Sequence, residues 1–181
     1  KQSLTLFVDV KTDGAKTWPL VLEQLEPLRQ RDWLTNFKDD KVHFHPITVV
    51  GTGNTPFNLL TANNTYRDAF YDAPLEKLES ETVRTAKGVD STSLYHPSNS
   101  YLASTSFAKS IGRLWWWSLS SSQLELIRTQ IRTAHALGLK ARYWELPSWP
   151  KRRRNYVWGV LVEEGIDLLN VDDLEDVKGV W

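Results

Sequence analysis

Residues 4–10 read LTLFVDV, a nearly continuous apolar run that ends in charge, with Asp9 inside it and Lys11 directly after it. Strands of parallel sheets, which are buried on both faces, have this composition. A second run, ITVVGTG at residues 47–53, ends in glycines. Further strand-like runs follow, and segments with helical spacing separate them. This alternation predicts a parallel α/β sheet.

The pattern predicts six strands and at least four helices. The expected strands cover residues 4–10, 47–53, 69–72, 101–105, 139–145 and 166–171, and the expected helices cover 18–31, with an interruption at Pro27, 56–63, 120–137 and 155–164. The clearest helix begins with the capping box Ser120-x-x-Gln123 and should stop at Gly138. Residues 76–99 have the polar composition of a long loop. Without repeats or a low-complexity linker, residues 1–181 are expected to form one domain or part of one.

Composition excludes several classes of function. The 22 Lys and Arg residues balance the 22 Asp and Glu residues, so no nucleic-acid partner is expected. The absence of cysteine excludes disulfides and thiolate metal sites. No apolar run approaches the roughly 18 residues of a membrane span. Asn63-Asn64-Thr65 is a glycosylation sequon, which matters only if the protein is secreted or membrane-associated. Three adjacent tryptophans, residues 115–117, cannot all point inward, so at least one is expected at the surface.

Polar residues follow nearly every expected strand. In a parallel barrel, the carboxyl ends of the strands carry the chemistry. The residues at these ends include Asp9 and Lys11, then Gly51, Thr52, Gly53 and Asn54, then Asp72, then Trp144 and Glu145, and finally Asn170, Asp172 and Asp173. Their clustering predicts a functional site at this edge.

Asp9 and Lys11 are two residues apart, so their side chains leave the strand on the same face. The carboxylate suits a divalent cation such as Mg²⁺ or Ca²⁺, and the ammonium suits a phosphate. A simple ion pair at the strand end is the alternative. The glycines before Asn54 would let the backbone approach a phosphate, although they match no standard phosphate-binding motif.

Asn170 and Asp172 repeat this same-face spacing. Asn170 could orient a ligand while Asp172 acts as a supporting carboxylate, or both could form an Asx turn and helix caps. Trp144 could line a substrate site or hold a cation on its ring, or it could be a core residue.

Lys151, Arg152, Arg153 and Arg154 form a basic run after Pro150. It could contact an anionic headgroup or membrane surface, or it could be a solvated loop. The four histidines, His43, His45, His96 and His135, do not follow a strand, so surface or packing roles are expected for them.

Five segments carry a family resemblance. KTDG with TWP, ITVVGTGNTP, YRDAFYDAPL, KARYWELPSWP and EEGIDLLNVDDL together resemble the fungal "altered inheritance of mitochondria" family. That family is grouped with PLC-like phosphodiesterases, which include glycerophosphodiester phosphodiesterases and spider-venom phospholipase D. The resemblance runs over nearly all of the chain.

The resemblance implies a TIM barrel with one divalent cation, Mg²⁺ or Ca²⁺, and two catalytic histidines. Asp9 would be a metal ligand, and Lys11 would offset phosphate charge. Trp144 would line the headgroup site, and Asn170 would lie near a glycerophosphodiester or lysophospholipid substrate.

The same resemblance implies that something is missing. The family's histidines and its acidic metal pair should precede Lys1, and 181 residues are fewer than the about 250 of a complete barrel. The fold expected is therefore strands three to eight of a (β/α)8 barrel whose first two units are missing from this chain. A further N-terminal segment or a second chain would complete the barrel, and the chain alone should bind metal poorly and not turn over.

Two other functions fit the same residues. A degenerate barrel could bind a ligand without catalysis. A glycoside hydrolase would use two facing carboxylates, for which Glu145 and Asp172 are the candidates.

Overall fold

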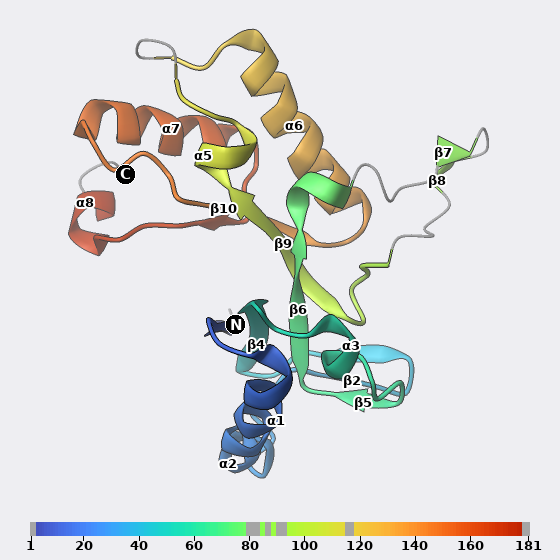
Figure 1. Cartoon of the computed structure of the whole chain (residues 1–181). Coiled ribbons are helices and arrows are strands. Elements are labelled where there is room, and N and C mark those ends of the chain that lie inside the picture. Colours follow the sequence, from blue (N-terminus) through green and yellow to red (C-terminus); the bar gives the residue numbers. More distant parts are fainter. Residues whose placement is uncertain (1–2, 79–83, 86–87, 90–93, 115–117, 179–181) are drawn as a thin grey trace. The chain divides into compact units, whose positions relative to one another are not determined.

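The computed structural model describes residues 3–78, 84–85, 88–89, 94–114 and 118–178. Figure 1 shows the whole chain with most of its elements labelled. The chain divides into two compact units. Unit 1 comprises Lys1–Ala73 and Tyr95–Tyr101, and unit 2 comprises Pro74–Leu94 and Leu102–Trp181. The prediction about the tryptophans at 115–117 falls outside the described residues.

The elements alternate much as the sequence predicts. The first half of the chain contains β1 (Leu4–Val10), α1 (Gly14–Gln24), α2 (Glu26–Arg29), β2 (Asn36–Lys38), β3 (Lys41–His43), β4 (Ile47–Gly53), α3 (Phe57–Leu60), β5 (Tyr66–Arg67) and β6 (Ala69–Pro74). The second half contains the 3-10 helix η1 (Leu75–Lys77), β7 (Arg84–Thr85), β8 (Gly88–Val89), β9 (Ser100–Ser106), α5 (Phe107–Ser110), α6 (Ser121–Ala136), β10 (Lys140–Trp144), α7 (Lys151–Glu163), β11 (Leu168–Leu169) and α8 (Leu174–Lys178). None of the described helices is long and apolar enough to cross a membrane.

The parallel strands of unit 1 bring their carboxyl ends to one edge. β1 pairs with β4 over its whole length, from Leu4 opposite Ile47 to Val10 opposite Gly53. β4 pairs in parallel with β6 on its other side. Both β1 and β4 have the bounds that the sequence predicts, because each is a short apolar run with clear punctuation at its end.

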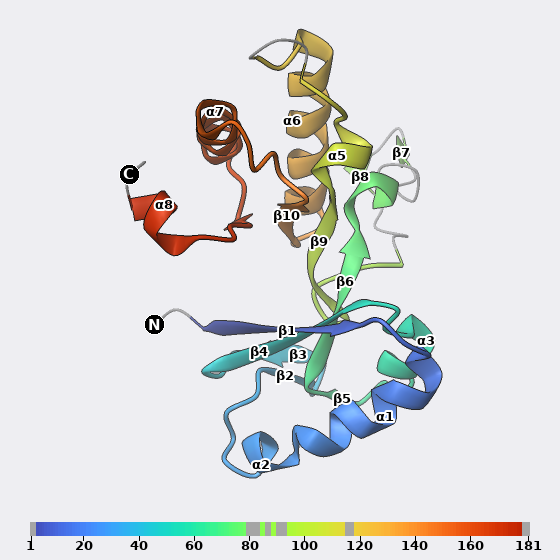
Figure 2. The same cartoon turned by 60° about the vertical axis from the view of Figure 1, so that its left-hand side comes forward.

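Helix α1 covers one side of β1 and β4, as Figure 2 shows. Asp13 begins it by accepting hydrogen bonds from the backbone of Ala15 and Lys16. The side chain of Trp18, a residue of α1, is only 1% exposed. It belongs to the core of unit 1, together with Val10, Leu25, Leu34, Val49, Leu60 and Ala69. The sequence predicts that the helix is interrupted at Pro27. The interruption lies at Leu25 instead, and Pro27 falls in the first turn of the next helix, α2, where proline is tolerated.

Unit 1 also contains a small antiparallel sheet that the sequence analysis missed, with the strand order β3-β2-β5. A two-residue turn joins β2 to β3, and both of its residues, Asp39 and Asp40, have positive φ values of 53° and 58°. Such a turn matches the twist of a hairpin, and aspartate tolerates it better than most residues do. In the sequence, Asp39 and Asp40 between two short strand-like runs are the feature from which this hairpin could have been predicted.

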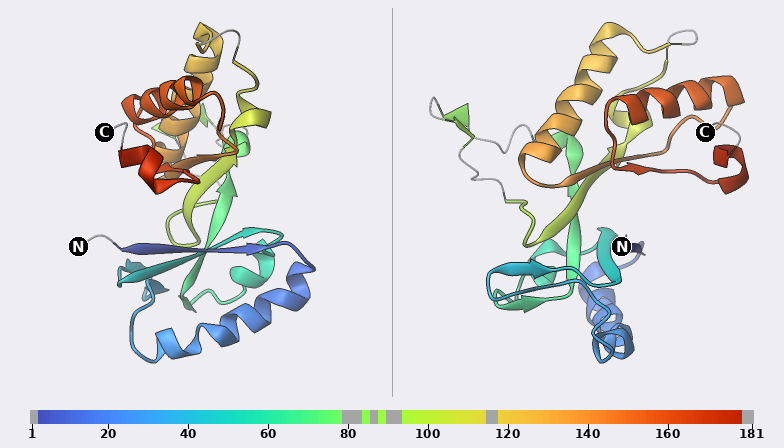
Figure 3. Two further views of the ribbon diagram at one scale, coloured as in Figure 1. Left: turned by 90° about the vertical axis from the view of Figure 1, so that its left-hand side faces the viewer. Right: turned by 180° about the vertical axis from the view of Figure 1, so that it is seen from behind.

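In unit 2, β9, β10 and β11 pair in parallel, and α6 packs against β10 (Figure 3). The predicted capping box of α6 is confirmed, since Ser120 and Gln123 each accept a hydrogen bond from the other's backbone. Tyr143, from β10, is fully buried and donates to Gln130 of α6 at 2.6 Å. Because the apolar face of α6 has clear helical spacing, its position against the sheet follows from its sequence.

The barrel prediction is wrong. The parallel strands follow the hydrogen-bonding order β1-β4-β6-β9-β10-β11, and among the described residues the first and last strands of this row do not pair with each other. The chain therefore forms an open parallel sheet of six strands, not strands three to eight of a (β/α)8 barrel whose first two units are missing. Alternation predicts which strands are parallel, but closure depends on strand tilt and stagger, which periodicity does not encode.

The basic run after Pro150 also differs from its prediction. Helix α7 begins at Lys151, whereas the expected helix begins at residue 155, so the run forms the first turn of the helix and not a loop. The short helices α5 and α8 were not predicted, because four or five residues give too little periodicity to recognise.

Candidate functional sites at the strand ends

The carboxyl end of β1 carries a charged pair. The Nζ atom of Lys11 lies 2.8 Å from Oδ2 of Asp9, and the two side chains are 79% and 47% exposed. The same-face placement predicted from their spacing is therefore confirmed. Because both groups remain accessible to solvent, the pair is free to exchange partners with a charged ligand.

The end of β4 holds Asn54 beside this pair. The backbone N–H of Asn54 donates to the carbonyl of Val10 at 2.7 Å, and its side-chain amide donates to the carbonyl of Thr12 at 3.2 Å. Gly53 has a positive φ of 66°, and a Cβ atom there would lie 2.4 Å from Oδ1 of Asp9. Only glycine fits this close approach. The structure thus brings Asp9, Lys11 and Asn54 to one edge of unit 1.

These residues do not make a metal site by themselves. Asp9 supplies one carboxylate, and that carboxylate is already paired with Lys11. Within the described part of the chain, no group of three or more His, Asp or Glu side chains could hold a metal ion. Mg²⁺ and Ca²⁺ normally take about six or more oxygen ligands, some of them water. The donor set present therefore does not fit the cation that the resemblance implies.

The strand ends of unit 2 line a second candidate site. Asn170 and Asp172 both line a pocket of about 360 Å³, together with Glu145, Lys151 and Arg154. Asn170 also accepts a hydrogen bond from the guanidinium of Arg142. The structure thus places these two predicted residues in one pocket.

Trp144 lies apart from this group. It is the last residue of β10, is 38% exposed, and is not among the residues that line the pocket. Its predicted role at a headgroup site stays a prediction.

Glu145 has a geometry that sequence reasoning did not anticipate. Its φ is 55°, a conformation that is uncommon for a residue with a side chain, and its carboxylate accepts a hydrogen bond from Ser106 at the end of β9. It lines the 360 Å³ pocket and also a larger one of about 610 Å³. Strained backbone of this kind is concentrated at functional sites, but no pattern in the sequence signals a positive φ at a glutamate.

The basic run is tied to helix α8 and is not uniformly exposed. Lys151 lies 2.8 Å from Asp176, and Arg154 pairs with the same carboxylate. Hydrogen bonds from these two cations lower the pKa of Asp176 below its ordinary value. Arg154 is buried at 8% exposure, and its guanidinium lies 4.4 Å from the ring centre of Trp158. Arg154 therefore stabilises the unit and is not available to an external surface.

Each of the four histidines has a partner away from Asp9, Lys11 and Asn54. The contacts join His43 to the carbonyl of Lys38 at 3.3 Å, His45 to the carbonyl of Asp32 at 2.8 Å, His96 to Ser98 at 2.7 Å and His135 to Asp167 at 2.7 Å. These contacts agree with the surface and packing roles expected for them.

Comparison with known proteins supports the resemblance to the fungal family. Residues 1–72 match the sequence model of the AIM6-like phosphodiesterase domain. The altered inheritance of mitochondria protein 6 homolog of Arthroderma benhamiae is 40% identical over 99% of this chain and 54% of its own length. Altered inheritance of mitochondria protein 6 of Lachancea thermotolerans is 33% identical over 97% of this chain and 44% of its own length.

Altered inheritance of mitochondria protein 6 of Saccharomyces cerevisiae is 31% identical over 95% of this chain and 46% of its own length. The chain thus spans about half the length of these relatives. The similarity covers both units and is not confined to the residues matched by the domain. No solved structure matches the chain significantly.

Proposed function

We propose that this chain, as a relative of the fungal altered inheritance of mitochondria proteins, contributes to a phosphodiesterase acting on glycerophosphodiesters or lysophospholipids. The observation that carries the proposal is the convergence of Asp9, Lys11 and Asn54 at one edge of unit 1. All three lie within residues 1–72, the stretch that matches a phosphodiesterase domain.

Lys11 has the role that the geometry supports best. Its ammonium is largely exposed and is held beside Asp9, so it can approach a phosphate while its side-chain direction stays defined. A cation placed beside the phosphoryl oxygens stabilises the charge that develops on them in the transition state. Asp9 would orient Lys11, and Asn54 would present its amide at the same edge.

The divalent cation, Mg²⁺ or Ca²⁺, remains a proposal with Asp9 as one ligand. The described residues contain no group of three or more His, Asp or Glu side chains that could hold the cation together with Asp9. The acid and base groups are likewise proposed to lie outside these 181 residues, since the four histidines of the chain are engaged elsewhere.

The test is phosphodiester hydrolysis by the whole protein, with glycerophosphocholine and lysophosphatidylcholine as substrates. Lys11→Gln and Asp9→Asn should each lower kcat/KM by about 100-fold or more, the usual cost of losing one group that stabilises the transition state. Lys16→Gln is a matched control, because Lys16 is 87% exposed and pairs with Asp13 one turn away. Near-normal turnover by both Asp9→Asn and Lys11→Gln would exclude this edge as the active site.

The metal is tested separately. Loss of turnover on adding EDTA, with recovery on adding Mg²⁺ or Ca²⁺, would support a cation-dependent reaction. Turnover that persists in EDTA would exclude it.

Two alternatives remain distinguishable. A ligand-binding protein without catalysis would show no turnover of either substrate. A glycosidase is favoured by one observation, that Glu145 and Asp172 line the same pocket. If Glu145→Gln and Asp172→Asn both leave sugar hydrolysis unchanged, the glycosidase reading fails.

We also propose that Lys151 and Arg152, the exposed members of the basic run, contact anionic headgroups. Charge-reversing Arg152→Glu should then weaken binding to vesicles that contain phosphatidylserine. Unchanged vesicle binding would exclude that contact.

A further inference from the structure

Asn54 holds the backbone on both sides of Lys11. Its backbone N–H donates to the carbonyl of Val10 at 2.7 Å, and its side-chain amide donates to the carbonyl of Thr12 at 3.2 Å. Val10 is the last residue of β1 that pairs with β4, where it lies opposite Gly53. Lys11 is therefore the first residue beyond the strand pairing, and Asn54 contacts the residue before it and the residue after it.

The side chain of Asn54 supplies a hydrogen bond that the backbone of β4 cannot supply. In a parallel pair, every second residue of one strand donates its N–H to the neighbouring strand. After Asn54, the next donor toward β1 would be residue 56, which is Pro56 and has no N–H. The chain also turns here, since Thr55 donates its hydroxyl back to the carbonyl of Thr52 at 2.8 Å. The amide of Asn54 thus replaces the donor that Thr12 would otherwise lack.

Gly14 lets a third segment lie against Asn54. It is the first residue of α1 and is buried. A Cβ atom at this position would lie 2.0 Å from the carbonyl oxygen of Asn54, so only glycine lets the start of the helix come this close. Thr12, which precedes the helix, is also held by a hydrogen bond between its hydroxyl and that of Thr17 at 2.8 Å. The end of β1, the end of β4 and the start of α1 therefore meet at Asn54.

These contacts fix the point from which the side chain of Lys11 extends. Its ammonium lies 2.8 Å from Asp9, although the side chain is 79% exposed. A lysine on an unrestrained loop would lose backbone freedom when it met a phosphate, which costs binding free energy. Here the backbone on both sides of Lys11 is ordered before any ligand arrives. Such order matters for a reaction, because a displacement of about 1 Å can lower a rate by about 100-fold.

We propose that Asn54 is a positioning residue, which orients Lys11 and acts on the reaction through it. Its two hydrogen bonds hold the residues on either side of Lys11, so that the ammonium is presented from a defined backbone. The kinetic consequence rests on the proposed phosphodiesterase function, whereas the effect of Asn54 on the order of the backbone does not.

The test combines steady-state kinetics of the whole protein on glycerophosphocholine and lysophosphatidylcholine with hydrogen exchange of the backbone amide of residue 54. Asn54 is exposed, so Asn54→Ala should fold. It should lower kcat by about 10–100-fold, because the cation is misplaced, and leave KM within about twofold. Loss of a hydrogen bond made equally to the substrate and the transition state would raise KM instead. Relative to its intrinsic rate, exchange at residue 54 should become about 3–10-fold faster, the effect of losing one hydrogen bond.

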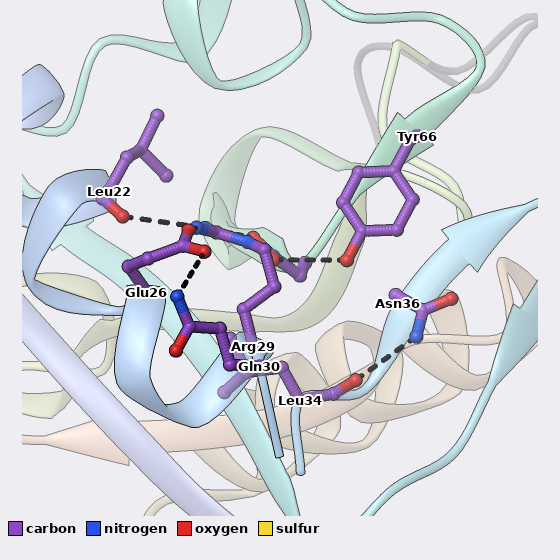
Figure 4. Close-up of polar contacts among 8 residues, drawn as sticks. Leu22, Glu26, Arg29, Gln30, Leu34, Asn36 and Tyr66 are labelled. Carbon is purple, nitrogen blue, oxygen red and sulfur yellow. Dashed lines mark hydrogen bonds and ion pairs between the residues drawn. The ribbon is translucent and has the colours of Figure 1, made fainter. Parts of the chain in front are cut away.

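Two asparagine variants are matched controls. Asn36 donates its side-chain amide to the carbonyl of Leu34 at 3.1 Å, the same kind of bond placed in the small antiparallel sheet, as Figure 4 shows. Asn36→Ala should lower the melting temperature but leave kcat per folded molecule unchanged. Asn58→Ala should change neither, because Asn58 is exposed and its side chain makes no hydrogen bond with the residues that the structure describes.

Gly14→Ala perturbs the same contact without changing the amide. The added Cβ must displace the carbonyl of Asn54 or the start of α1, so kcat should fall by about 10-fold or more. If both variants act through the position of Lys11, the double variant should be about as slow as the slower single variant, because effects on one shared contact do not add.

Two results would overturn the proposal. The first is an Asn54→Ala variant with raised KM and unchanged kcat, and the second is exchange at residue 54 that is as slow in this variant as in wild type. If the wild type itself shows no turnover, the proposed function fails, and the exchange measurement alone decides whether Asn54 orders the backbone at Lys11.

Discussion

Gly53→Ala tests the contact on which the candidate site at β1 and β4 depends. Gly53 has a φ of 66°, and an added Cβ would lie 2.4 Å from Oδ1 of Asp9 and 2.6 Å from the carbonyl oxygen of Val10. The left-handed conformation costs alanine roughly 1–2 kcal/mol. Crowding against a closely packed backbone typically adds about 1–3 kcal/mol. We therefore expect a total loss of about 2–5 kcal/mol in the free energy of unfolding.

Gly112→Ala separates these two costs. Gly112 has a φ of 82°, but nothing lies within 4 Å of a Cβ added there. The free energy of unfolding of Gly112→Ala should therefore fall only by the conformational cost of roughly 1–2 kcal/mol. The difference between the two variants therefore measures the crowding at Asp9.

The assay is urea unfolding followed by circular dichroism, with hydrogen exchange to assign each transition to a unit. A chain of this length loses about 2–4 °C of melting temperature for each kcal/mol, so the two variants should be distinguishable by thermal melting too. Gly53→Ala should also reduce phosphodiester turnover in the fraction that remains folded, because the Asp9 carboxylate must move. Equal destabilisation by Gly53→Ala and Gly112→Ala would refute the close packing of Gly53 against Asp9.

Three further variants have outcomes that follow from single contacts. Asp68→Asn should cost about 1–3 kcal/mol in urea unfolding, because it removes a charged hydrogen-bond partner of Arg29 while Glu26 still pairs with that guanidinium. Ser120→Ala should cost about 1 kcal/mol through loss of the capping box of α6. Burial, and to a smaller extent the charge of Arg67, lower the pKa of His96 below its ordinary value of 6.5. The unfolded chain therefore takes up this proton more readily, so stability should fall as the pH drops below about 6.5, and His96→Gln should flatten that dependence.

Each of these variants has a matched control. Asp40→Asn alters an exposed carboxylate in a turn, and its φ of 58° suits asparagine. Ser121→Ala alters an exposed serine beside the cap of α6, and His43→Gln removes a histidine that is exposed. Each control should change stability by less than about 0.5 kcal/mol. If Asp68→Asn, Ser120→Ala or His96→Gln changes stability no more than its control does, the contact assigned to that residue is contradicted.

The sequence by itself determined the local elements whose signal is contained in neighbouring residues. The bounds of β1 and β4 follow from short apolar runs, and the start of α6 follows from Ser120 and Gln123. The pairing of Asp9 with Lys11 follows from the two-residue period of a strand.

The tertiary structure alone decided the features that depend on distant parts of the chain. Whether a sheet closes into a barrel depends on the tilt and stagger of all its strands. The arrangement of the six parallel strands therefore could not be predicted from the sequence of any one strand. Arg154 is buried because Asp176 and Trp158 surround it. The positive φ of Glu145 likewise has no local cause in sequence. These outcomes depend on which charges and surfaces meet in space, and spacing along the chain does not record that.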